Sequence, residues 1–227
     1  YAQEEIPEGL IKPFDVNKDL YYTLDIEAGR VREIQINPEE PGIQNLSLNI
    51  YIIERELLIC QISAAFVRGY VFFERDILAP QLDKLNVRGY KFGGYIARIS
   101  SIKSYFDENM KLLDEENLDA LFGGNHIYTK IRDDNPTRYI KGAKAKNIMA
   151  ADGCIIEGEV ENSVLFRGVR VGKGAKVKNC VLMQDTVIEP GVNVEYIISD
   201  KNVTITADKE IKGTDSFPVY VAKYQVV

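Results

Sequence analysis

Residues 162–178 have the sequence NSVLFRGVRVGKGAKVK, and residues 179–195, NCVLMQDTVIEPGVNVE, repeat this pattern at an offset of 17 residues. Five positions carry the same kind of side chain in both copies: Asn162 and Asn179, Val164 and Val181, Val171 and Ile188, Gly174 and Gly191, and Val177 and Val194. A third copy begins at Tyr196 and has Ile198, Ile205 and Ile211 at the corresponding places. A repeat of fixed length indicates one structural unit that is stacked several times.

Within each copy the mostly aliphatic positions fall five or six residues apart. They are Ile148, Cys154, Val160, Leu165, Val171, Val177, Leu182, Ile188, Val194, Ser199, Ile205 and Ile211. A period near six, with a small or turn residue soon after the aliphatic one, favours short strands joined by sharp corners. Three such sides form one coil of a triangular parallel β-helix, and several coils must stack to bury the inner face. We therefore predict a β-helix with these side chains inside; the alternative is an ordinary β-rich domain with many valines.

Residues 1–125 are typical of a mixed α and β structure. Residues 21–26 and 31–36 predict two strands, because Ala28-Gly29 between them supplies the turn. Residues 45–53 predict a third strand, since they are rich in branched and aromatic side chains. The helical spacing of apolar residues predicts helices at 54–67, 72–85 (interrupted near Pro80), 101–113 and 117–122.

The composition argues against several classes of function. The 227 residues correspond to roughly one and a half domains. The net charge of −6 argues against a nucleic-acid partner, which normally requires a basic face. A single histidine excludes a multi-histidine metal site, and three unpaired cysteines (Cys60, Cys154 and Cys180) are expected to be buried thiols in the cytoplasm. No uninterrupted apolar run reaches about 18 residues, so we expect no membrane partner.

Residues 126–146 predict a connector between the two parts of the chain. This segment is basic, with six lysines and arginines against Asp133 and Asp134. A solvated linker is one interpretation. An anion or effector site is the other, because clustered cations attract phosphates; its candidate residues are Lys130, Arg132, Arg138 and Lys141.

No complete catalytic site is visible in the sequence. Acyltransferases built on a β-helix use a histidine as general base, and no histidine follows His126. Ser100 and Ser101 have no base partner that the sequence identifies. Gly93-Gly94 lacks the pattern of a phosphate-binding loop. We therefore assign no catalytic residue.

Two segments resemble a known family when they are taken together with the β-helix. They are residues 47–53, SLNIYII, and residues 94–113, GYIARISSIKSYFDENMKLL; within the β-helix, Met183-Gln184-Asp185 is the most specific stretch. Their order is similar to that of the C-terminal part of the bacterial glucose-1-phosphate adenylyltransferases (ADP-glucose pyrophosphorylases).

The resemblance implies the C-terminal part of a Rossmann-like nucleotidyltransferase domain over residues 1–125. A connector at 126–146 and a left-handed parallel β-helix of hexapeptide-type repeats at 147–227 would follow. It also implies that the sequence is a fragment without the N-terminal half of the nucleotidyltransferase domain.

The chain departs from this family at the positions that the resemblance assigns to the sugar phosphate and the metal. The metal-binding aspartate falls on Arg98. The Glu-Lys pair of the family's Phe-x-Glu-Lys-Pro motif falls on Ile36 and Asn37. The usual Met-Gly after Ser47 is Leu48-Asn49, and the glycine-to-asparagine change adds bulk. We therefore expect a degenerate sugar-phosphate pocket at Ile36, Asn37, Ser47, Asn49 and Arg98, with no bound metal.

This pattern of departures resembles the noncatalytic GlgD branch of the family. It implies a regulatory subunit whose catalytic adenylyltransferase partner holds Mg²⁺ and makes ADP-glucose from ATP and glucose 1-phosphate in glycogen biosynthesis. We expect homo- or hetero-oligomers through the β-helix, at residues 147–215. Two alternatives stay open. One is an active sugar-phosphate nucleotidyltransferase in which Arg98 contacts a phosphate, and the other is a β-helix acyltransferase.

Overall fold

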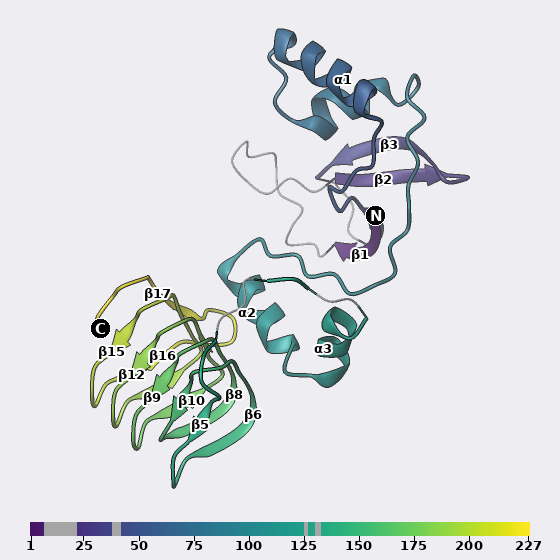
Figure 1. Ribbon diagram of the computed structural model, residues 1–227. Coiled ribbons are helices and arrows are strands. Elements are labelled where there is room, and N and C mark those ends of the chain that lie inside the picture. Colours follow the sequence, from purple (N-terminus) through teal and green to yellow (C-terminus); the bar gives the residue numbers. More distant parts are fainter. Residues whose placement is uncertain (7–21, 38–41, 125–126, 130–132) are drawn as a thin grey trace. The chain divides into compact units, whose positions relative to one another are not determined.

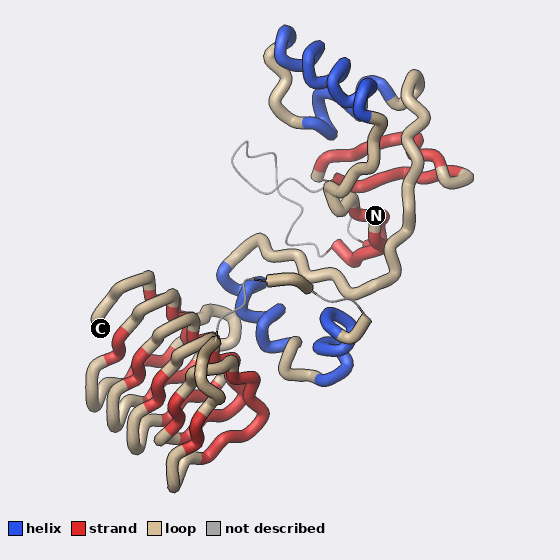
Figure 2. The backbone as a smooth tube through the Cα atoms, viewed as in Figure 1, coloured by secondary structure: helices blue, strands red, loops and turns tan. Residues whose placement is uncertain are grey.

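The computed structural model of the protein describes residues 1–6, 22–37, 42–124, 127–129 and 133–227. The chain divides into two compact units, Tyr1–Gly94 and Tyr95–Val227 (Figure 1). The first unit combines a sheet with helices, and the second contains a stack of short parallel strands (Figure 2). The predicted α/β part and the predicted parallel β-helix are both confirmed.

The sheet of the first unit is antiparallel, with the strand order β1-β4-β2-β3. Its strands are β1 (Ala2–Ile6), β2 (Tyr22–Glu27), β3 (Arg30–Ile36) and β4 (Gly42–Leu46). The hairpin of β2 and β3 is confirmed. Ala28 and Gly29 have φ angles of 49° and 79°, which is the backbone of the tight turns that match the twist of a hairpin.

The predicted strand at 45–53 is wrong for most of its length, because β4 ends at Leu46. The chain turns immediately afterwards. Asn49 has a φ of 55°, and its backbone N–H donates a hydrogen bond of 3.2 Å to Ser47 Oγ. Branched side chains favour a strand only where a neighbouring strand accepts the backbone hydrogen bonds. Ser47 still donates its backbone N–H to Tyr22 of β2, but among the described residues 48–53 have no such neighbour.

The helices of the first unit follow β4. Helix α1 (Arg55–Arg68) confirms the helix predicted at 54–67 and ends at Gly69, whose φ is 70°. The predicted second helix is shorter than expected. It consists of a π-helical segment, η2 (Phe73–Leu78), followed by one 3₁₀ turn, η3 (Ala79–Gln81). Pro80 lies in η3, where its missing N–H prevents an α-helix from continuing through it.

No single helix in the described ranges has the length and apolar character needed to cross a membrane. Helix α1 passes that test only together with η2 and η3, as a pair bent by 96°.

The parallel stack of the second unit confirms the predicted repeat. Its strands are β5 (Arg138–Tyr139), β6 (Lys144–Ala150), β7 (Ile155–Ile156), β8 (Glu159–Leu165), β9 (Arg170–Val171), β10 (Lys176–Lys178), β11 (Val181–Leu182), β12 (Val187–Ile188), β13 (Asn193–Glu195), β14 (Ile197–Ser199), β15 (Thr204–Ile205), β16 (Glu210–Lys212) and β17 (Val219–Val221). The residues aligned by sequence are paired in space: Val164 with Val181, Val171 with Ile188, and Val177 with Val194. The third copy pairs in the same way, through Ile198, Ile205 and Ile211.

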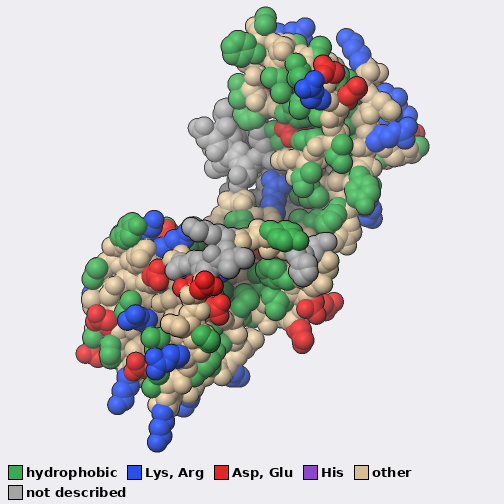
Figure 3. Space-filling view, in the orientation of Figure 1, with side chains coloured by type: hydrophobic (Ala, Val, Ile, Leu, Met, Phe, Trp, Pro, Cys, Tyr) green, Lys and Arg blue, Asp and Glu red, His purple; other side chains and the backbone are tan. Residues whose placement is uncertain are grey.

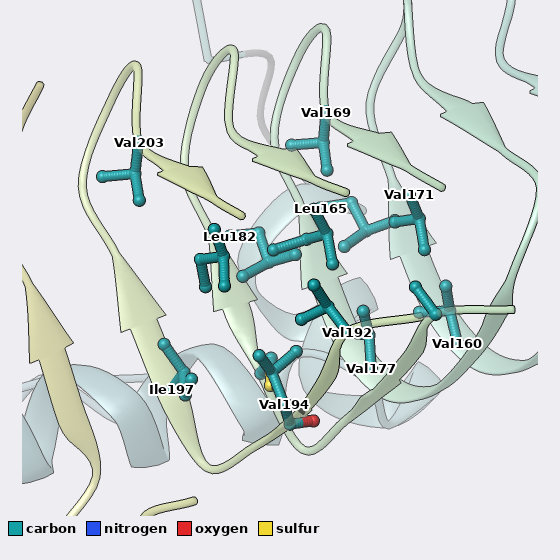
Figure 4. Close-up of a cluster of buried hydrophobic side chains, with 14 of the residues drawn as sticks. Val160, Leu165, Val169, Val171, Val177, Leu182, Val192, Val194, Ile197 and Val203 are labelled. Atoms are coloured by element: carbon teal, nitrogen blue, oxygen red, sulfur yellow. Dashed lines mark hydrogen bonds between the residues drawn. The ribbon is translucent and has the colours of Figure 1, made fainter. Parts of the chain in front are cut away.

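The predicted inward positions lie in the core of this β-solenoid, together with buried residues that were not predicted, among them Ile156, Val192 and Val203. Aliphatic side chains from successive coils point into the interior and stack on one another (Figure 4). Of the predicted set, Cys154, Val160, Leu165, Val171, Val177, Leu182, Ile188, Val194, Ser199 and Ile205 are buried. Ile148 and Ile211 are partly buried against the same cluster.

The register of Cys154 differs from the prediction. Ile156, and not Cys154, pairs with Val171, so the offset here is 15 residues instead of 17. The corner at Gly158 is two residues shorter than the corresponding corner at 172–175. It is so tight that a Cβ on Gly158 would lie 2.4 Å from the Ala175 carbonyl oxygen. Cys154 is therefore buried, but at a different place in its coil.

One line of corners is built from asparagine. Asn147, Asn162 and Asn179 have φ angles of 50°, 45° and 50°, and the equivalent corner of the next coil is Tyr196 at 52°. Asparagine adopts this left-handed conformation more readily than other residues with a side chain. Asn147 Nδ2 also donates a hydrogen bond of 2.9 Å to Asn162 Oδ1, which links two corners of the stack.

Two helices belong to the same compact unit as the solenoid, and both confirm predictions. They are α2 (Ile102–Lys111) and α3 (Glu115–Phe122). Helix α2 lies beside the strands (Figure 1), where Phe106 packs against Val181 and Ile198. The second unit starts at Tyr95 and the stack of strands at Arg138. The expected division into domains at 1–125, 126–146 and 147–227 stays a prediction.

Candidate functional site

The pocket positions expected in the first unit gather around one end of β2. Ile36 is paired with Tyr22 on one side of that strand. On the other side, the Ser47 backbone N–H donates a hydrogen bond of 2.8 Å to the Tyr22 carbonyl oxygen. Ile36 and Ser47 therefore flank the same buried tyrosine, and the sheet brings together residues that are separated in the sequence.

A tyrosine and a carboxylate, neither of them predicted, complete this cluster. Tyr51 Oη donates a hydrogen bond of 2.5 Å to Glu74 Oε1 and lies 3.3 Å from Ser47 Oγ. Burial, and then the hydrogen bond to Glu74, raises the pKa of Tyr51, so that the phenol stays protonated. Tyr51 belongs to the stretch SLNIYII, whereas Glu74 lies 23 residues away and no local pattern marks it.

A second carboxylate near this cluster, that of Asp76, forms all of its hydrogen bonds with neighbouring residues in the chain. Asp76 Oδ2 accepts hydrogen bonds of 3.0 Å from the backbone N–H groups of Val71 and Phe72. Its other oxygen pairs with Arg75 Nε at 2.6 Å. The Arg75 guanidinium and then the two backbone donors lower the pKa of Asp76 well below its usual range. Asp76 therefore fixes the start of η2 and remains ionised.

The two asparagines of the expected pocket lie at turns. Asn37 and Asn49 have φ angles of 49° and 55°. The resemblance places glycine at position 49, and asparagine is the substitute that adopts a left-handed backbone at the least cost. Both side chains are neutral amides, so neither supplies the cation that would hold a phosphate group.

Arg98 lies in the second unit, in the irregular segment between Tyr95 and α2, and its side chain is partly exposed. Magnesium binds hard oxygen ligands, and a guanidinium offers only N–H donors. The residue at this position therefore does not fit a metal site. Within the described ranges, no group of three or more potential His, Cys, Asp or Glu ligands lies together.

The predicted anion site can be placed only in part. Arg138 begins β5 and Lys141 lies in the turn that follows, with both side chains exposed. Lys130 and Arg132 lie outside the described residues. An anion or effector site at these four residues stays a prediction.

The three cysteines are not alike. Cys154 and Cys180 are buried as expected, whereas Cys60 is exposed on α1, so the expectation of three buried thiols is wrong at this position. Burial raises the pKa of Cys180 to about 12. The helical pattern that predicts α1 does not show which of its faces is covered.

Comparison with known proteins agrees with this architecture. Residues 131–217 match the sequence model of a family described as "GlmU-like, C-terminal hexapeptide". The chain is 37% identical over 195 residues to the protein named "Glycogen biosynthesis protein GlgD" of Bacillus subtilis (strain 168), an alignment that covers 86% of this chain and 57% of that protein. It belongs to the GlgD and glucose-1-phosphate adenylyltransferase family.

Other members of the GlgD and glucose-1-phosphate adenylyltransferase family show similar relationships. A "Glycogen biosynthesis protein GlgD" of Geobacillus stearothermophilus is 53% identical over 70 residues, covering 30% of this chain and 20% of that protein. A "Glucose-1-phosphate adenylyltransferase" of Clostridium perfringens (strain SM101 / Type A) is 32% identical over 169 residues, covering 70% of this chain and 42% of that protein. The alignments cover at most 57% of the length of these relatives.

Proposed function

We propose that this chain is the C-terminal part of a regulatory, noncatalytic subunit of a glucose-1-phosphate adenylyltransferase that acts in glycogen biosynthesis in the cytoplasm. The observation that carries the proposal is Arg98, a cation at the position where the resemblance assigns a metal-binding aspartate. The neutral side chains at Ile36 and Asn37 support it. Relatives named for glycogen biosynthesis support the pathway.

The proposed partner is a catalytic adenylyltransferase chain that holds Mg²⁺ and binds the solenoid of this protein. Two features of the last coil support such an interface. Strands β16 and β17 stand at the two ends of their sheet, so each has an edge without a paired strand among the described residues. Three large side chains of this coil are also exposed: Tyr220, Tyr224 and Val226.

The proposal is tested by mixing the full-length protein with the adenylyltransferase of the same organism. We expect the two chains to co-purify, and the rate of ADP-glucose formation, or its response to activators, to change in the mixture. Val226→Asp should weaken the association. Ile43→Asp is a matched control, because Ile43 is 77% exposed and Val226 71% exposed, but Ile43 lies in the first unit. Chains that neither associate nor alter the rate would contradict the proposal.

A second candidate function is supported by the relatives named as adenylyltransferases. In this alternative the chain belongs to an active nucleotidyltransferase, and Arg98 contacts a phosphate group instead of excluding a metal. The full-length protein would then form ADP-glucose without a partner, and Arg98→Ala would abolish the reaction. That result would replace the regulatory proposal.

A further inference from the structure

The segment that carries Arg98 belongs to the solenoid unit and not to the unit that holds the other pocket positions. The division between the units falls between Gly94 and Tyr95. Gly93 and Gly94 precede this point, and a Cβ on Gly93 would meet no atom within 4 Å. Glycine is the residue with the greatest backbone freedom. The chain therefore has an adaptable backbone at Gly93, just before the Arg98 segment.

The first anchor of this segment is a tyrosine bound to α2. Tyr95 Oη donates a hydrogen bond of 2.8 Å to Glu108 Oε2. The other oxygen of Glu108 pairs with Lys111 Nζ at 2.7 Å, and the Glu108 side chain is only 13% exposed. Both carboxylate oxygens are thus engaged. Tyr95 is thereby bound to a side chain that is itself fixed within the helix.

The second anchor is the start of α2. Ser101 Oγ accepts a hydrogen bond of 3.0 Å from the Ser104 backbone N–H, which caps the helix. In return, Ser104 Oγ accepts from the backbone N–H groups of Ser100 and Ser101, at 2.9 and 2.8 Å. Residues 96–100 are therefore held at both ends by the same helix, and Arg98 lies at their centre.

Helix α2 is in turn fixed to the solenoid through an aromatic pair. Phe106 is 1% exposed, and its ring centroid lies 6.1 Å from that of Tyr196. Tyr196 occupies the corner that Asn179 occupies one coil earlier, with a φ of 52°. A tyrosine in this conformation costs more than an asparagine. The contact of its ring with α2 offsets that cost.

We infer that residues 95–101 form a strap that the solenoid holds in place, with the connection running from Tyr196 through Phe106 and α2 to Tyr95. Whatever binds the solenoid and displaces α2 thereby alters the mobility of Arg98. This inference deepens the proposed regulatory function and rests on it for its biological use. The mechanical connection itself concerns one compact unit and can be measured in the protein without a partner.

The experiment is limited digestion of the full chain with trypsin, which cleaves after Arg98 and after Lys178. Cleavage at Arg98 measures opening of the strap, and cleavage at Lys178, in β10, measures opening of the solenoid. Tyr95→Phe removes the hydroxyl of the first anchor. Tyr196→Asn removes the ring that holds α2, while asparagine suits the corner backbone. Both variants should accelerate cleavage at Arg98 about tenfold and leave cleavage at Lys178 unchanged.

Two control variants are matched to these changes. Tyr220→Phe also removes a tyrosine–carboxylate hydrogen bond, of 3.0 Å to Asp200 Oδ2, but outside the strap, so cleavage at Arg98 should not change. Tyr196→Phe keeps the ring and should behave like the parent protein. An unchanged rate at Arg98 in Tyr196→Asn, or equal acceleration at Arg98 and Lys178, would overturn the inference. If the variants open the strap as expected but the full-length protein binds no catalytic chain, the inference about the strap stands and only the proposed function is contradicted.

Discussion

Single residues decide how the corners and the outer surface of the solenoid are used. Asparagine supplies the left-handed corners at Asn147, Asn162 and Asn179. Val181 shows that a repeat position on the outer side of a strand can also be buried. It points outward on its strand yet is 0% exposed, because Phe106 of α2 covers it. A repeat position can therefore be buried from outside the coil as well as from inside it.

The burial of Val181 predicts that Val181→Asp destabilises the protein by about 3–5 kcal/mol, because the carboxylate would be buried without a partner. The free energy of unfolding, measured by chemical denaturation, tests this. Val187→Asp is the matched control, since Val187 lies in an equally short strand and is only partly buried. Similar losses in the two variants would contradict the role of α2.

The buried thiol of Cys180 predicts a specific pH dependence. Burial, the main cause, raises its pKa from 9.0 to about 12. The folded state therefore keeps a proton that the unfolded state loses. The contribution to stability is complete below pH 9.0 and is lost as the pH rises towards about 12. Between these limits the loss should be about 1.4 kcal/mol per pH unit.

Chemical denaturation of the parent protein and of Cys180→Ala at several pH values isolates this effect. The difference in stability between the two should shrink as the pH rises above 9.0. Parallel curves for the two proteins would show that Cys180 does not titrate in this way.

At the scale of elements, the outer face of β6, β8, β10, β13 and β16 carries columns of charged side chains. One column runs Lys146, Glu161, Lys178, Glu195 and Lys212, with opposite charges on every pair of neighbouring coils. Lys146 Nζ and Glu161 Oε1 are 3.1 Å apart. Basic and acidic side chains are intermingled on the solenoid surface in Figure 3. The alternation stabilises the register that the inward aliphatic residues also favour.

The column predicts that Glu161→Lys destabilises the solenoid, because it places three lysines in succession. We expect a loss of about 0.5–1 kcal/mol at low ionic strength, declining as salt is added. Thermal or chemical unfolding at two salt concentrations measures it. Glu157→Lys makes the same charge change at an exposed position that forms no ion pair with the residues that the structure describes, and should have little effect. A salt-independent loss in Glu161→Lys would argue against the columns.

Elements differ in how far sequence alone could predict them. The later strands of the solenoid are predicted in register because the same aliphatic positions recur in each copy. In the first coil, the short corner at Gly158 shifts both Ile148 and Cys154. Residues 48–53 have strand composition, but among the described residues no strand pairs with them, and composition does not reveal the missing neighbour. The hydrogen bond between Tyr51 and Glu74 joins distant parts of the chain, so no local pattern could predict it.

At the scale of the whole molecule, the chain combines two units with different kinds of stability. The solenoid is held by contacts between adjacent coils, so its stability is nearly a sum of similar contributions. The first unit depends on one small antiparallel sheet and on α1, where Ile62, Phe66 and Val67 remain exposed. The family could be predicted from the order of motifs along the chain. The division of the pocket positions between the units depends on where the chain passes from one to the other, which sequence spacing does not show.

The variable corners of the solenoid have a consequence for how such a protein can diverge. Neighbouring coils are offset by 15 residues at Lys144 and Glu159, by 17 at Lys176 and Asn193, and by 22 at Ile197 and Val219. The inward side chains remain aligned in every case. A corner can thus gain or lose residues while the pairing of the inward side chains stays the same. The outline offered to other molecules can therefore be remodelled one corner at a time, without any change in the buried residues.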